Sequence, residues 1–130
     1  MSNSRENISG NSPWEDIVGY SRAVKFGNQI FISGTTATDN NGKIVGLNDP
    51  YEQTIHIIKN ISSALEKAGA ALKDIVRIRI YVVDINNWEI IGKALSKYFI
   101  DIKPAATMVE VNKLISPEIL VEIEADAFLG

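Results

Sequence analysis

Tyr20, Arg22 and Glu122 carry three groups that can take part in chemistry, a phenol, a guanidinium and a carboxylate. In an extended segment Tyr20 and Arg22 project to the same face, because alternate side chains of a strand share one side. A guanidinium in a pocket wall can bind an anion through two parallel hydrogen bonds. The alternative for Arg22 is a surface position with its stem packed down. A phenol stays protonated at pH 7 unless its surroundings perturb it, so Tyr20 is not expected to act as an acid or base.

Glu122 lies in a segment near the C-terminus where apolar and charged residues alternate, the pattern of a strand with one buried face. A partly buried carboxylate can acquire a base-like pKa and then assist the attack of water. The alternative is that Glu122 is one member of an ion-pair network between subunits. The other members of that network would be Arg77, Arg79, Glu110 and Glu124.

Other kinds of chemistry find little support in the composition. The chain has no cysteine, which excludes disulfides, thiolate nucleophiles and sulfur-ligated metals. Its one histidine, His56, is expected at the edge of the core, because a metal site would need more ligands. There is no glycine-rich phosphate loop. The net charge of −3 disfavours a nucleic-acid partner. We therefore expect neither a metal nor an organic cofactor.

The length of 130 residues predicts one domain, and 45% hydrophobic with 22% charged residues predicts a folded one. Residues 1–13 are polar and are expected to form a flexible tail that precedes a single domain over residues 14–130. They lack the apolar stretch of a signal peptide, and no window approaches the ~20 apolar residues of a membrane span. We expect a soluble cytoplasmic protein without a membrane partner.

The apolar periodicity predicts seven elements in the order strand, strand, helix, strand, helix, strand, strand. Gly27-Asn28 joins the first two strands as a hairpin. Asp49 and Pro50 start the first helix, and Gly69 ends it. Asn86 and Glu89 resemble a capping box of a second helix, with Trp88, Ile91, Leu95, Tyr98 and Phe99 on its inner side. The remaining strands are expected at residues 75–83, 107–111 and 119–128, the first of them with Val76, Ile78, Ile80 and Val82 on its buried face.

These elements predict an α+β two-layer sandwich in which both helices cover one face of a mixed sheet. The opposite face is half apolar and carries charges of both signs, which suggests contact with another subunit. Its residues are Arg77, Arg79, Tyr81, Glu110, Leu120, Glu122, Glu124, Asp126 and Phe128.

Several segments resemble the YjgF/RidA family, whose members are also described as endoribonuclease L-PSP. The strongest match is residues 103–111, Lys-Pro-Ala-Ala-Thr-Met-Val-Glu-Val, followed by residues 121–125. Residues 19–24, 27–28, 32–34 and 65–69 match in the same order, so the resemblance covers nearly everything from Gly19 to Ala127.

The resemblance implies a chorismate-mutase-like fold and a homotrimer in which the sheets form a central β-barrel with a cleft at each interface. It implies cofactor-free hydrolysis of reactive imines and enamines to oxo acids and ammonium. Glu122 matches the glutamate that positions water, and Tyr20 the pocket tyrosine. Thr107 matches the motif's Ser/Thr, and Met108 a backbone N–H that faces the substrate. The arginine that binds the substrate carboxylate is replaced by Ala106.

Two functions therefore stay open. The chain is a hydrolase of imines or a related small metabolite, with Arg22 supplying the missing cation, or it is a trimeric binding protein or regulator that has lost turnover. An endoribonuclease is disfavoured by the negative net charge and the single histidine.

Overall fold

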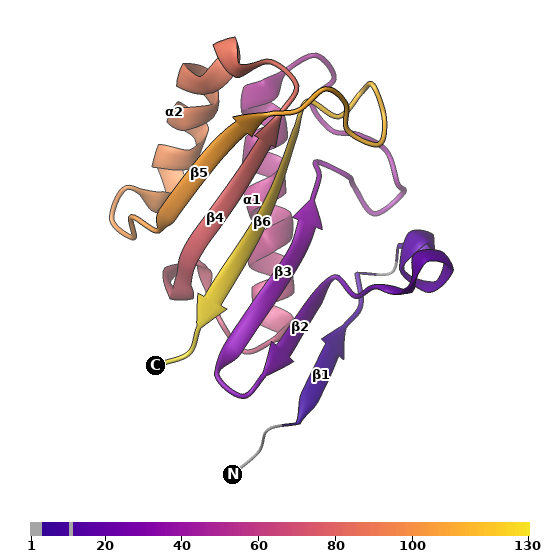
Figure 1. Cartoon of the computed structure of the whole chain (residues 1–130), viewed down its shortest axis with the longest axis vertical. Helices are drawn as coiled ribbons and strands as arrows, with labels where there is room; N and C mark the ends of the chain where they lie inside the picture. The colour runs from indigo at the N-terminus through magenta and orange to yellow at the C-terminus, as the bar shows by residue number, and fades with distance from the viewer. Residues whose placement is uncertain (1–3, 11) are drawn as a thin grey trace.

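A mixed six-stranded sheet with two helices on one face forms the body of the computed structural model, which describes residues 4–10 and 12–130 (Figure 1). The strand order is β1-β2-β3-β6-β4-β5, with β4 and β5 parallel and the other pairs antiparallel. The strands are β1 (Arg5–Ile8), β2 (Ala23–Phe26), β3 (Gln29–Thr35), β4 (Ile75–Val82), β5 (Ala105–Glu110) and β6 (Val121–Phe128), and the helices are α1 (Pro50–Lys67) and α2 (Trp88–Phe99). The α+β architecture and the helices on one face are confirmed.

The N-terminal segment corrects the prediction of a flexible tail. Strand β1 pairs with β2, with Ile8 opposite Ala23, and Ile8 is buried in the core. Residues 4–10 and 12–13 lie within the described part of this segment, while residues 1–3 and 11 lie outside it. One apolar side chain in a polar stretch gave too weak a periodic signal to predict a strand of four residues.

The first hairpin and the first helix agree with the predictions from the sequence. Gly27 adopts φ +61° in the turn between β2 and β3. The side chain of Asp49 accepts a hydrogen bond from the backbone N–H of Glu52 at 3.1 Å, and Gly69 ends the helix at φ +81°. The buried face of α1 contains Ile57, Ile58, Ile61, Ala64 and Leu65.

Helix α2 begins differently from the prediction. A short 3₁₀ turn over Ile85–Asn87 precedes it, and Asp84 accepts the N–H of Asn86 at 3.0 Å, so no capping box forms at Asn86. Trp88 is the first residue of the helix and is 57% exposed, which corrects its assignment to the inner side. Ile91 and Phe99 are buried, and Leu95 and Tyr98 pack partly against the core, as expected.

A bulge at the start of β4 changes which residues face the core. The pairing with β6 shifts between Ile75 and Arg77, so Ile75 is buried and Val76 is 49% exposed, contrary to the prediction for Val76. The extra residue of a bulge reverses the alternation on one side of it. The rest of the strand keeps the predicted faces.

The buried amide of Gln53 connects α1 to two loops. Its Nε2 donates to the carbonyl oxygens of Gly46 at 3.1 Å and Glu118 at 2.9 Å, and its Oε1 accepts the N–H of Leu120 at 2.9 Å. A satisfied buried amide fixes the groups around it, because breaking any of these bonds leaves a buried polar atom without a partner. The start of β6, which carries Glu122, is therefore held in a fixed place. Within the described residues, no helix is long and apolar enough to cross a membrane.

Candidate active site

A bulge in β3 brings Gly34 against the carboxylate of Glu122. The pairing of β3 with β6 shifts between Ile32 and Thr35, and Gly34 lies inside this irregular stretch. A Cβ atom built on Gly34 would clash with Oε2 of Glu122. The carboxylate thus occupies the space that any other residue at position 34 would fill. A glycine within a strand often marks such a close approach, and this signal was present in the sequence.

Arg22 extends to the same place from the segment before β2. Its Nη2 donates a hydrogen bond to the carbonyl oxygen of Gly34 at 2.5 Å, and its stem lies against Gly10. Nε is buried and has no hydrogen-bond partner among the described residues. The side chain therefore combines both sequence-based alternatives, with a packed stem and a guanidinium that lies near Glu122 rather than in solvent. Burial lowers the pKa of Arg22, while nearby Tyr20, Glu15 and Glu122 act to raise it.

Glu122 is half-buried, and it makes no hydrogen bond or ion pair with any other described residue. Burial raises the pKa of its carboxyl above the ordinary 4.5, Arg22 acts to lower it, and Glu124 acts to raise it. Desolvation thus makes this carboxylate a stronger base than that of an exposed glutamate.

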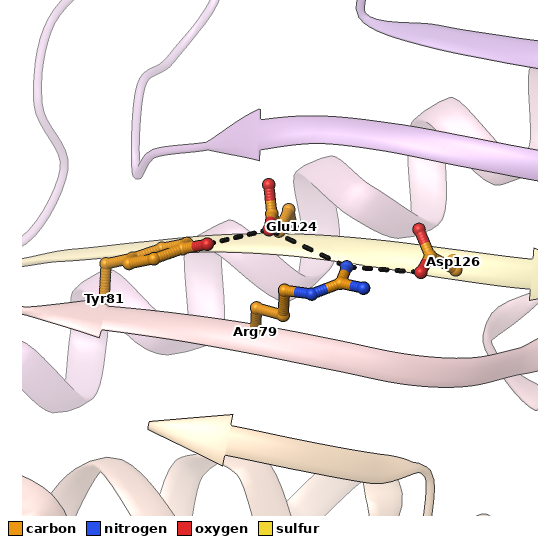
Figure 2. Close-up of polar contacts among 4 residues, drawn as sticks. All are labelled: Arg79, Tyr81, Glu124 and Asp126. Atoms are coloured by element: carbon orange, nitrogen blue, oxygen red, sulfur yellow. Dashed lines mark hydrogen bonds and ion pairs between the residues drawn. The ribbon is translucent and has the colours of Figure 1, made fainter. Parts of the chain in front are cut away.

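The charged network on the open face of the sheet does not include Glu122. Figure 2 shows Arg79 between Asp126 and Glu124, with distances of 3.2 and 3.7 Å from its Nη1, and the hydroxyl of Tyr81 donating to Glu124 at 2.8 Å. These groups are one-third exposed, and such pairs contribute at most about 1 kcal/mol. The hydrogen bond to Glu124 raises the pKa of Tyr81. Of the residues in the expected network between subunits, Arg79 and Glu124 interact within one chain, whereas Glu110 accepts the N–H of Ile85 at 3.0 Å.

Tyr20 lies beside a polar pocket of about 340 Å³ near the short π-helix Glu15–Gly19. Glu15 was not identified from the sequence. It is buried, and its Oε2 accepts the N–H groups of Gly10 at 2.9 Å and Ser12 at 3.3 Å. This carboxylate holds the segment that packs against the stem of Arg22. Only its position before a short turn could have indicated this role.

The predicted site residues of β5 do not join this cluster within one chain. Ala106 pairs with Ile78 and faces α2, while Thr107 pairs with Arg79 and faces the open side of the sheet. Strand β4 separates β5 from β6, so the backbone of Thr107 is about 10 Å from that of β6. Met108 packs partly against the core. The predicted residues form two groups, Tyr20, Arg22 and Glu122 in one and Ala106, Thr107 and Met108 in the other.

His56 is half-buried on α1. Among the described residues, no three His, Cys, Asp or Glu side chains are grouped closely enough to hold a metal ion.

Residues 10–129 match the model of the family described as Endoribonuclease L-PSP. The chain belongs to this family. A RutC family protein of Pyrococcus abyssi is 42% identical over 110 residues, which span 84% of this chain and 85% of that protein. The 3-aminoacrylate deaminase RutC of Acinetobacter baylyi is 32% identical over 108 residues, covering 83% and 85% of the two chains.

The fold of this chain also matches solved structures of the family. A Mycobacterium tuberculosis member of the YjgF/YER057c/UK114 family superimposes with a TM-score of 0.88 at 44% identity, covering 97% of this chain and all of the other. The resemblance to YjgF/RidA proteins is therefore confirmed at the level of family and fold.

The contact between Gly34 and Glu122 predicts that Gly34→Ala separates activity from stability. The new methyl displaces the end of a flexible side chain rather than backbone. We therefore expect the free energy of unfolding to change by less than about 1 kcal/mol, while the carboxylate moves and any reaction that uses it slows as strongly as in Glu122→Gln. Urea unfolding and a rate assay measure the two effects. Gly130→Ala is the control, because a Cβ there meets no atom within 4 Å. An active Gly34→Ala would contradict the prediction.

Two substitutions should move the pKa of Glu122 in opposite directions. Arg22→Gln removes a positive charge that lowers this pKa, so the pKa rises, and Glu124→Gln removes a negative charge that raises it, so the pKa falls. Carbon-13 NMR titration of the Glu122 carboxyl measures both shifts. Because the folded chain binds this proton more tightly than the unfolded chain, stability falls as the pH rises above about 4.5, and Glu122→Gln should be more stable than the parent at pH 7. Shifts of the same sign in both variants would refute the assignment.

Proposed function

We propose that this protein hydrolyses reactive imines and enamines derived from amino acids, without a cofactor, and that Glu122 is its general base. The observation that carries the proposal is the half-buried carboxylate of Glu122, which lies against Gly34, feels the charge of Arg22 and has no hydrogen-bond or ion-pair partner among the described residues. The similarity to a 3-aminoacrylate deaminase supports the same reaction class, since 3-aminoacrylate is an enamine.

The reaction needs only proton transfers and a bound water. The carboxylate of Glu122 accepts a proton from water as the oxygen attacks the carbon of the C=N bond, forming a carbinolamine. The proton then passes to the nitrogen. The hydroxyl proton of the carbinolamine follows by way of Glu122, so the C=O bond forms as the C–N bond breaks, and ammonia leaves an oxo acid. An enamine first gains a proton at carbon and loses one from nitrogen to become this imine. General acid–base catalysis by one positioned group contributes about 10²–10⁴-fold to such a rate.

Arg22 and Tyr20 would bind the substrate beside this base. Ala106 offers no cation at the position where the family resemblance implies an arginine, and burial of an unpaired carboxylate is costly. Arg22 has a buried Nε without a partner and already lies near Glu122. We propose that its guanidinium takes the carboxylate, while Tyr20 forms a wall of the pocket and Thr107 and the backbone N–H of Met108 contact the substrate from another subunit.

The complete site would form between copies of the chain in a homotrimer, with the sheets around a central barrel. The separation of the β5 residues from Glu122 within one chain supports this proposal, because a cleft containing both groups needs a second copy. The open sheet face supports it too, with large apolar side chains left exposed among charges: Phe26, Phe31 and Phe128, at 48, 44 and 51%. Exposed apolar surface of this kind marks interaction sites.

The second candidate function is a binding protein without turnover. Ala106 favours this function, because a site without the anion-binding side chain stabilises a charged transition state less. The binding protein would take the same small-molecule ligand and would need no metal or cofactor.

Release of oxo acid decides between the two functions. We would generate 2-aminoacrylate with a dehydratase and follow pyruvate formation with and without the protein. We expect acceleration above the spontaneous rate, a loss of about 100-fold or more in Glu122→Gln, and a KM raised at least tenfold in Arg22→Gln, which loses a charged hydrogen-bond donor. Glu118→Gln is the control, since that side chain is exposed on a loop. A folded trimer that gives no acceleration would leave the binding function.

Light scattering should give a mass of three times 14.3 kDa. Phe31→Asp should dissociate the trimer, because it places a charge beside Asp126, the pairing partner of residue 31, on the proposed interface. Ile115→Asp is the control, at an 80% exposed position in a loop. A parent protein that scatters as a 14.3 kDa monomer would overturn the inter-subunit site.

A further inference from the structure

An apolar groove separates α2 from β5 at the edge of the sheet, on the face opposite Glu122. It encloses about 350 Å³ and is lined mainly by Ile78, Leu95, Phe99, Ile100, Gly92 and Ala106. This volume falls in the range of small-ligand sites, about 300–1,000 Å³. The groove is open to solvent along one side.

Two small residues leave this groove unfilled. Gly92 lies inside α2, where glycine destabilises a helix relative to alanine. A Cβ at Gly92 would meet no atom within 4 Å, so local crowding does not require the glycine. Across the groove, Ala106 presents only a methyl group from β5. Larger apolar residues at either position would fill the space and bury more surface. The sequence therefore keeps a void where packing alone would favour filling it.

The groove has a positive end. Lys103 is the only charged residue among the described residues that line it, and it is exposed in the turn that joins α2 to β5. An apolar slot with one ammonium group at its edge complements a small anion that carries an apolar group.

We propose that this groove binds the apolar side chain of a 2-imino or 2-oxo acid, with Lys103 as a second cation for the acid group that Arg22 of another copy holds, and that it selects branched or aromatic side chains over a methyl group. The identity of the ligand's acid and imine groups rests on the proposed function. Because Ala106 and Glu122 lie on opposite faces of one sheet, a ligand in the groove would reach Glu122 of a second copy rather than that of its own chain.

Binding of stable oxo acids tests the groove without any turnover. Calorimetry would compare 4-methyl-2-oxopentanoate with pyruvate, which share the acid and the carbonyl and differ by an apolar group. We expect the branched acid to bind at least tenfold more tightly, as burial of its extra carbon atoms requires, with NMR shifts in the methyl groups of Leu95 and Ile100. Equal affinity for the two acids, or no binding of either, would overturn the proposal.

Variants assign the preference to the groove. Gly92→Leu places a side chain in the space and should reduce the preference to less than threefold, whereas Lys93→Leu, which adds the same side chain at an exposed position one residue further along α2, should keep it. Lys103→Gln should weaken both acids by a similar factor. A Gly92→Leu protein that still prefers the branched acid would refute the groove. A clear preference in a protein that hydrolyses no imine would refute only the proposed function, and imine hydrolysis without a preference would refute only the groove.

Discussion

The close approach of Gly34 to Glu122 is the constraint on which the candidate site depends. Because residue 34 has no side chain, the carboxylate of Glu122 can lie directly on the β3 bulge, half-buried and without a hydrogen-bond donor from the described residues. The carbonyl oxygen of the same glycine holds the guanidinium of Arg22. One residue thereby places a basic carboxylate and a cation side by side. Burial and the charge of Arg22 act in opposite directions on the pKa of Glu122.

Hydrogen bonds elsewhere in the chain hold the segments that carry these residues in place. Gln53 fixes the loop that leads into β6, and Glu15 fixes the segment against which Arg22 packs. On the open face, Arg79 forms an ion pair with Asp126, and Tyr81 donates a hydrogen bond to Glu124 (Figure 2). Glu122, the third carboxylate of β6, has no such partner among the described residues. The arrangement is costly for folding, since an unpaired, partly buried carboxylate destabilises the chain at neutral pH. Such a trade between stability and activity is common at sites that carry out chemistry.

The fold and the chemistry have separate determinants in this chain. Its α+β architecture superimposes closely on that of a family member at 44% identity. The residues around Ala106 and Gly92 instead form an apolar groove with a single lysine at its edge. Two of the side chains that line this groove, Ile78 and Phe99, also belong to the core, whereas Gly92 and Ala106 add almost no side-chain volume to it.

The sequence by itself determined the elements that have strong local signals. Asp49-Pro50 and Gly69 fixed the ends of α1, Gly27 fixed the first hairpin, and the alternation in β6 placed Glu122 on the open face. Local signals failed where a single residue decided the outcome. Strand β1 forms because Ile8 is buried, Val76 is exposed because of a bulge, and α2 starts at Trp88 because a short turn precedes it. The sequence, through its family resemblance, also indicated Tyr20, Arg22 and Glu122 as site residues. Only the tertiary structure showed that Arg22 donates to the carbonyl oxygen of Gly34 and that Glu122 lies outside the network of Arg79. It also showed that Ala106 lies on the opposite face of the sheet from Glu122. These facts depend on register and on contacts between strands distant in sequence, which no periodicity within one segment encodes.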